Sequence, residues 1–322
     1  MLKNVRLVFF LLITLGALSP LRAQQAAQPL LDDILDKAGD EMFKYFDAFK
    51  NLLSEETKTI ETFDKHGEVK KTKTLKSTFL VYQLTKDETR SVEFRNVIAV
   101  DGKPLDNADK HTQDFFTKVS NAESSSKELD QLYKESSRYD GDLVVDGLTL
   151  FQSLVLSKSL RPLFAFTYVG TKSKDGVSVY EISYQQTKGS PDISINNKRN
   201  TNSGKSGFDY EIDTDSNKEL NGRLRGTLWV DSSTFQIRGE HRELTVQPEG
   251  VGKPMPVIVN DFEFQSSDFG ILTPRRITHI QSRLTDKGQE TAKEIRLTLN
   301  YANFSRPDVE VKSSEVKNPP KP

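Results

Sequence analysis

The sequence predicts an α+β fold: a strongly curved antiparallel sheet, forming an incomplete barrel, with helices covering its concave face. The clearest sign lies in residues 293–304, where Ile295, Leu297, Leu299 and Tyr301 alternate with polar residues. Such alternation is typical of a sheet with one buried and one solvated face. Similar segments follow one another at short spacing, and amphipathic helix patterns precede and interrupt them. In an α+β fold, helices cover the apolar face of such a sheet.

The first 23 residues predict a secretory signal peptide. Lys3 and Arg6 precede an apolar run over residues 7–18, and Ala23 ends a segment suited to cleavage. The run is too short to span a bilayer, so we expect no transmembrane anchor after cleavage. The chain contains no cysteine, so no lipid-modified N-terminal cysteine follows the cleavage site. We therefore expect a periplasmic or secreted protein.

The mature chain opens with a predicted helix over residues 29–53. Apolar residues recur there at spacings of three and four, as on the buried face of a helix, and Pro29 suits the first turn. Two strands are predicted next, over residues 75–84 and 90–100, with the short spacing of an antiparallel meander. A turn follows at residues 101–104, where Asp-Gly precedes Lys-Pro.

The middle of the chain changes character twice. Residues 105–140 predict one or two amphipathic helices, joined near residues 121–126. Residues 143–156 carry an apolar run that favours a buried helix over a strand. Residues 163–169 and 177–184 are β-rich and flank a turn at residues 174–176, which predicts a hairpin.

Two polar stretches are expected to lie outside the packed sheet. Residues 186–221 form a polar loop insert, and residues 306–322 form a proline-bearing tail that we expect to be disordered. The intervening chain predicts five strands, over residues 222–230, 235–246, 257–264, 271–284 and 293–304. Residues 24–305 are therefore expected to form a single half-barrel domain.

Composition excludes several classes of protein. Loss of Lys3, Arg6 and Arg22 with the leader changes the formal net charge from −1 to −4, which argues against a nucleic-acid binder. With no cysteine, the chain cannot form disulfides, thiol nucleophiles or cysteine-bound metal sites. No nucleophile elbow, phosphate-binding loop or zinc-hydrolase helix motif occurs. We expect no enzyme, no cofactor and no bound metal.

Two weaker patterns leave alternatives open. His241 and His279 lie in predicted strands and could meet across the sheet, where Glu243 could complete a metal site; two structural residues on the solvated face are the favoured interpretation, because metal ligands usually cluster more tightly. Acids alternate over residues 209–215, but Ser216 stands where a calcium loop needs glycine, so a charged edge strand is favoured.

The apolar face of the sheet is the candidate binding surface. If the sheet curves, this face lines a cavity and the helices become its lid; otherwise the face is a filled core. The candidate wall residues, chosen by alternation, are Leu228, Val230, Phe235, Ile237, Phe262, Phe264, Ile295, Leu297, Leu299 and Tyr301.

The chain resembles the periplasmic outer-membrane lipoprotein carrier (LolA-like) superfamily. The resemblance rests on the leader, the opening helix, the strands at residues 75–84 and 90–100, the stretch 226–238 (GTLWVDSSTFQIR), and the proline-bearing start of a strand at residues 271–275 (ILTPR). It implies a half-barrel that shields acyl chains, with a lipid or an acylated lipoprotein as partner. Related half-barrels also bind envelope proteins.

The resulting hypothesis is an exported, non-enzymatic carrier that holds acyl chains in an apolar cavity. The alternative is an envelope scaffold or regulatory protein-binding module with a filled core. The interior of the sheet distinguishes the two, because a carrier needs space that a scaffold does not.

Overall fold

The fold was analysed in a computed structural model of the chain. The structure describes residues 19–50, 52–87, 91–106, 108–141, 148–150, 152–189, 194–196, 209–211, 222–247, 252–284 and 290–306. Residues 1–18 of the predicted signal peptide, the tail from residue 307 and most of the polar insert lie outside these ranges. Within the described part of the chain, no helix is long and apolar enough to cross a membrane.

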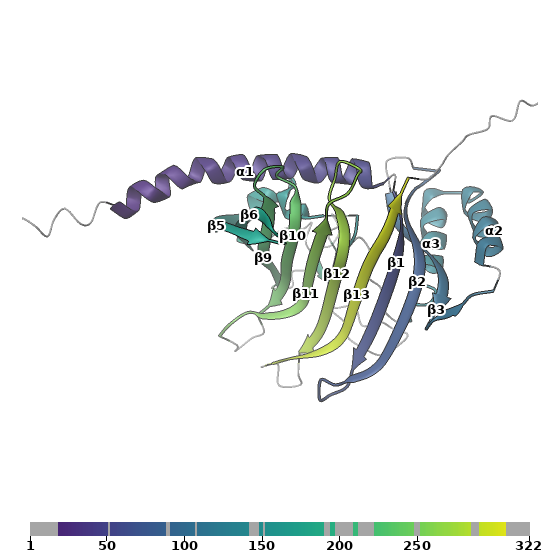
Figure 1. Cartoon of the computed structure of the whole chain (residues 1–322). Coiled ribbons are helices and arrows are strands. Elements are labelled where there is room, and N and C mark those ends of the chain that lie inside the picture. The colour runs from purple at the N-terminus through teal and green to yellow at the C-terminus, as the bar shows by residue number, and fades with distance from the viewer. Residues whose placement is uncertain are drawn as a thin grey trace, which may run out of the picture.

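Thirteen strands and three α-helices are described, with two short 3-10 turns (Figure 1). The helical elements are α1 (Ser19–Phe49), α2 (Ala108–Ser120), α3 (Ser125–Ser136), η1 (Leu154–Leu156) and η2 (Arg161–Leu163). The strands are β1 (Leu53–Phe63), β2 (Val69–Gln83), β3 (Ser91–Val100), β4 (Lys103–Pro104), β5 (Phe164–Lys174), β6 (Val177–Gln186), β7 (Ser194–Asn196), β8 (Asp209–Glu211), β9 (Gly222–Asp231), β10 (Ile237–Val246), β11 (Met255–Gln265), β12 (Thr273–Leu284) and β13 (Thr291–Ser305).

Eleven of these strands form one open antiparallel sheet. Its order is β4-β3-β2-β1-β13-β12-β11-β10-β9-β6-β5, so β4 and β5 are the two edges and the sheet does not close into a barrel. The sheet bends, and β5 and β6 turn away from the plane of β11 to β13 (Figure 1). The predicted meander β2–β3, the hairpin β5–β6 and the five late strands are confirmed. β7 and β8, within the polar insert, pair only with each other.

The two faces of the sheet carry separate apolar clusters. We call the face that bears Phe79, Leu228, Phe262 and Leu299 the inner face; its cluster also holds the buried side of α1. A second cluster, on the opposite face of β2 and β3, joins Val92 and Phe94 to α2 and α3. Its members are Leu84, Val92, Phe94, Val119 and Leu132, with partly buried neighbours. Helices therefore pack on both faces, because β3 alternates between them.

The predicted helix at residues 29–53 differs from α1 at both ends. Helix α1 begins at Ser19 and ends at Phe49, and Leu53 already belongs to β1. Strand β1 shows no apolar alternation, because its inward positions include Ser54, Glu56 and Lys58, all buried. These polar side chains resemble a solvated face until their partners across the sheet are known.

The predicted buried helix at residues 143–156 is wrong for the described part of that segment. Residues 148–150 and 152–153 form turns, and only the short 3-10 turn η1 is helical. Ser153, just before η1, adopts a left-handed backbone with φ of 44°, which an α-helix does not accommodate. The expected burial is present, because Leu148, Leu150, Val155 and Leu156 are all buried.

Glycine is required at position 226 of β9. A Cβ there would lie 2.0 Å from the backbone oxygen of His241 and 2.6 Å from the hydroxyl of Tyr184. We expect Gly226→Ala to lower the free energy of unfolding by about 2 kcal/mol or more, because the backbone must shift. Denaturant titration followed by circular dichroism measures this. Gly252→Ala meets no atom within 4 Å and is expected to change stability by less than about 0.5 kcal/mol; equal effects would contradict the prediction.

Candidate functional site

The candidate wall residues lie together on the inner face. Eight of them are buried in its cluster, and Phe235 and Ile295 are partly buried and pack against it. The strand register explains the grouping, since Leu299 pairs with Ile277 on β12 and Ile277 pairs with Phe262 on β11. Alternation thus placed the residues on one surface, while their role as a ligand-binding wall stays a prediction.

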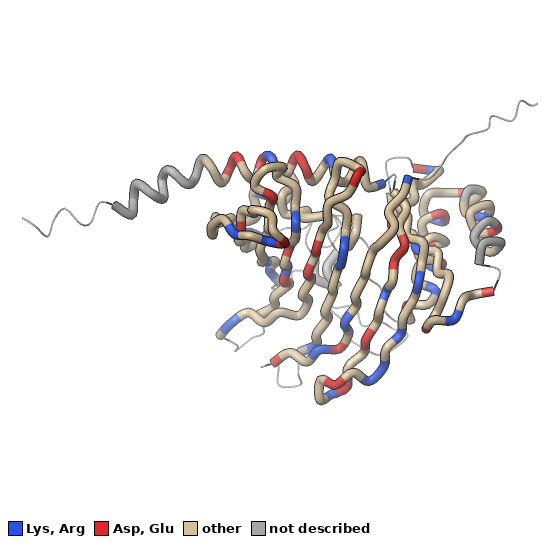
Figure 2. The backbone as a smooth tube through the Cα atoms, in the orientation of Figure 1, with Lys and Arg blue, Asp and Glu red and all other residues tan. Residues whose placement is uncertain are grey.

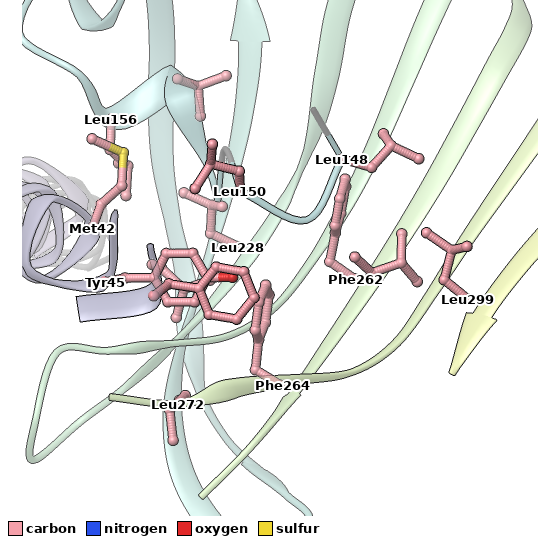
Figure 3. Close-up of a cluster of buried hydrophobic side chains, with 14 of the residues drawn as sticks. Met42, Tyr45, Leu148, Leu150, Leu156, Leu228, Phe262, Phe264, Leu272 and Leu299 are labelled. Atoms are coloured by element: carbon pink, nitrogen blue, oxygen red, sulfur yellow. The ribbon is translucent and has the colours of Figure 1, made fainter. Parts of the chain in front are cut away.

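Helix α1 and an irregular segment, residues 148–150 and 152–156, which we call the strap, pack against the inner face. Figure 3 shows Leu148 of the strap beside Phe262, Leu150 beside Leu228 and Leu156 beside Met42 of α1. The described strap contains turns and η1 but no strand, so it adds no hydrogen bonds to the sheet ladder. Polar groups of Thr149, Leu150 and Ser153 instead form hydrogen bonds with side chains of the inner face and of α1.

One anchor of the strap is a buried charge triad. Arg95 of β3 donates from Nε to both oxygens of Glu56 (2.9 and 3.0 Å) and from Nη2 to Glu93 at 2.9 Å. All three side chains are at most 4% exposed. The guanidinium also lies 5.0 Å from the ring centroid of Phe79. A guanidinium offers donors in a fixed fork, which suits two carboxylates at once.

Thr149 and Leu150 of the strap bind this triad through their backbone. Both amide N–H groups donate to Oε1 of Glu93 at 2.7 Å. The hydroxyl of Tyr45, on α1, donates to the carbonyl of Thr149 at 2.7 Å, and the hydroxyls of Thr149 and Tyr301 are 2.5 Å apart. Burial raises the pKa of Tyr45 well above 10 and the charge of Glu93 adds to this, so the phenol keeps the proton that it donates.

A second anchor has a similar construction on β10. Glu240 accepts from Arg242 at 2.9 and 2.7 Å, from Tyr184 at 2.6 Å and from the hydroxyl of Ser153 at 2.9 Å. Arg242 lies 5.0 Å from the ring centroid of Phe262. Burial acts to raise the pKa of Glu240, but the charge and hydrogen bonds of Arg242 outweigh it and the pKa is lowered. The carboxylate is therefore ionised at neutral pH.

Side chains fill the space between the strap, α1 and the sheet in the region around Tyr45. A hollow there has room of about 10 Å³, lined by Glu41, Tyr45, Gln152, Gln236, Ile237, Ile271 and Leu272. This is the size of one water molecule. In the conformation described, the surface that could bind a ligand near Tyr45 is occupied by the protein itself.

His241 and His279 do not meet across the sheet to form a metal site, and the expectation that both lie on the solvated face is wrong for His279, which is buried. His241 Nδ1 lies 2.7 Å from Asp261, and His279 Nδ1 lies 2.7 Å from Asn260. Asp261 and Asn260 are consecutive in β11, so the two histidines lie on opposite faces. Among the described residues, no group of three His, Asp or Glu side chains could hold a metal ion. Of the acids at residues 209–215, only Asp209 to Glu211 are described, and they form β8.

The polar anchors were missed by the sequence reasoning. In the sequence, Glu93 and Arg95 alternate with apolar Val92 and Phe94, a pattern typical of a strand whose charged side chains face solvent. The available signal was a repeated Glu-x-Arg spacing, 93–95 and 240–242, in two predicted strands. Residues two apart in a strand share a face, but the pattern alone does not tell which face is buried. The remaining charges are of mixed sign along the strands and α1 (Figure 2), as in the pair Glu61–Arg296.

No family model matches this sequence, and no curated protein matches it significantly. Solved structures similar to the chain include a DUF1329 family protein from Desulfovibrio piger (14% identity, 85% of this chain and 93% of that chain covered, TM-score 0.35). They also include an outer membrane lipoprotein-sorting protein domain from Vibrio parahaemolyticus (7%, 85% and 92%, TM-score 0.36) and a LolA superfamily protein from Nitrosomonas europaea (10%, 86% and 94%, TM-score 0.29). This agrees with the resemblance stated from the sequence; it is a likeness of fold and says nothing about ligand or partner.

Proposed function

We propose that this protein is an exported, non-enzymatic carrier that binds an acyl chain on the inner face of its sheet. The observation that carries the proposal is the strap: it packs against the apolar cluster of the inner face, yet it is attached by hydrogen bonds to the buried side chains Glu93 and Glu240 and not by strand pairing. The strap can therefore detach from the inner face without breaking backbone hydrogen bonds of the sheet. In this proposal the strap closes the inner face in the conformation described, and the acyl chain takes the place of the strap.

The binding energy in this proposal is a difference between two burials. Each methylene of an acyl chain that leaves water contributes about 0.8 kcal/mol. Release of the strap exposes Leu148, Leu150, Val155 and Leu156, which are buried in the closed form. A long acyl chain offsets this loss and a short one does not, so affinity should rise with chain length. The apolar wall residues Leu228, Val230, Phe235, Ile237, Phe262, Phe264, Ile295, Leu297, Leu299 and Tyr301 would contact the chain.

The first test is native mass spectrometry of the mature protein purified from its own cell envelope, with organic extraction of what it carries. We expect a lipid at about one per chain. Clean protein that also takes up no fluorescent acyl probe would contradict the carrier and favour the alternative, an envelope scaffold or regulatory protein-binding module. The small volume of the hollow near Tyr45, about 10 Å³, favours that alternative, because a filled core needs no space for a ligand.

A strap variant sharpens this test. Ser153→Ala removes the hydroxyl that donates to Glu240 and leaves the apolar face unchanged. Loss of a hydrogen bond to a charged group destabilises the strap on the inner face by about 1.5 kcal/mol. The probe then displaces the strap more easily, and we expect roughly tenfold tighter binding. Titration of probe fluorescence measures it. Ser159→Ala, an exposed serine just beyond the strap, is the matched control and should leave the affinity unchanged; weaker or unchanged binding by Ser153→Ala would argue against displacement of the strap.

A further inference from the structure

The peptide unit between Thr149 and Leu150 of the strap has a hydrogen-bond partner for its carbonyl and for its N–H group. Glu93 Oε1 accepts the N–H groups of Thr149 and Leu150, and Tyr45 donates to the carbonyl of Thr149. Tyr301 contacts the hydroxyl of Thr149. These groups come from α1, β3 and β13, so the sheet and helix together form a buried site for an amide, which the chain fills with its own backbone.

The charge around this site is unbalanced. The triad holds one guanidinium, that of Arg95, and two carboxylates, those of Glu56 and Glu93, so its formal net charge is −1. Lys58 lies on the same face two residues beyond Glu56, but it is paired with Asp140 at 2.9 Å. Arg95 binds Glu93 through Oε2, whereas Oε1 faces the strap. Oε1, the carboxylate oxygen of Glu93 on the side of the strap, is therefore the atom that accepts the two amides.

Departure of the strap affects the two anchors unequally. Glu240 loses the hydroxyl of Ser153 but keeps Arg242 and Tyr184. Glu93 Oε1 loses both amide donors that it has from the strap. A buried carboxylate oxygen left without donors is costly, and the cost falls only if the incoming molecule donates hydrogen bonds there. An anionic group at the same place would instead meet a like charge.

From this asymmetry we propose that Glu93 determines which acyl compounds bind: those whose polar end carries an N–H donor are accepted, and those ending in a free carboxylate are rejected. The inference rests on the proposed function, because it concerns the polar end of the same site. A neutral amide and an ammonium group share the donor chemistry, and the experiment separates them.

The experiment is a competition assay on the full mature protein with a bound fluorescent acyl probe. Three competitors of equal chain length are compared: hexadecanamide, hexadecylamine and hexadecanoate. We expect the amide and the amine each to displace the probe at about tenfold lower concentration than the carboxylate. In Glu93→Gln the excess charge is gone, and we expect the preference to fall to less than about twofold. If the amine displaces the probe at tenfold lower concentration than the amide, charge determines the selection. If the amide and the amine displace it at equal concentrations, hydrogen bonding determines the selection.

Two controls separate the inference from the proposed function and from misfolding. Glu243→Gln is the matched control, because Glu243 lies on the opposite face of β10 and contacts Arg225; it should keep the wild-type preference. Thr149→Val removes only the strap hydroxyl, leaves Glu93 in place, and should bind all competitors more tightly with the preference retained. If the three competitors bind wild type equally, the inference fails and the carrier stands. If none binds wild type or Thr149→Val, the proposed function fails as well.

Discussion

Replacement of Arg95 by leucine is expected to lower the free energy of unfolding by about 3–5 kcal/mol, because it leaves buried carboxylates without their cation. Glu56 and Glu93 are at most 1% exposed, and both bind the guanidinium directly. Equilibrium unfolding in urea, followed by circular dichroism, measures the change. The loss should also loosen the strap, since Glu93 anchors Thr149 and Leu150.

Arg275→Leu is the control for this effect. Arg275 pairs with Glu263 at 3.0 Å, but the arginine is 46% exposed. Exposed ion pairs contribute about 1 kcal/mol at most. We therefore expect a small change in Arg275→Leu, and a similarly small change in Arg95→Leu would mean that the triad is hydrated and does not hold the strap.

The second large effect is a loss of stability in mild acid, caused by His279. Burial lowers the pKa of His279 to about 4 from its ordinary 6.5. Between these two pH values His279 is protonated in the unfolded chain but neutral in the folded chain. The free energy of unfolding therefore falls as the pH drops from 6.5 toward 4. The difference between the two pKa values corresponds to a total loss of about 3 kcal/mol in the free energy of unfolding. Unfolding titrations between pH 7 and pH 4 should show this slope, and His279→Gln should flatten it.

His241 provides the opposite sign in the same sheet. Its hydrogen bond to Asp261 raises its pKa, so its contribution to stability is complete below pH 6.5 and is lost as the pH rises through the raised value. His241→Gln should therefore alter the stability profile above pH 6.5 and leave the acid slope intact. An acid slope that survives His279→Gln would show that another buried group accounts for it.

The apolar part of the candidate site could be predicted from the sequence, and the polar part could not. The alternating pattern of one strand predicts three of these residues, Leu297, Leu299 and Tyr301, because side chains two positions apart lie on the same side of a strand. Glu93 and Arg95 show the same spacing, but their burial depends on Glu56, which is brought beside them by the pairing of β1, β2 and β3. Local sequence does not encode that pairing.

The sequence by itself determined the elements with a regular apolar pattern: the hairpin β5–β6, the late strands and the helices α2 and α3. It could not determine what covers the sheet. Strand β3 turns Val92 and Phe94 to one face and the buried charges Glu93 and Arg95 to the other, so α2 and α3 pack opposite to α1. The apolar run at residues 143–156 predicts a buried helix, but the conformation of the strap is set by Glu93, Tyr45 and Glu240. These contacts join residues far apart in the chain, so only the tertiary structure decided them.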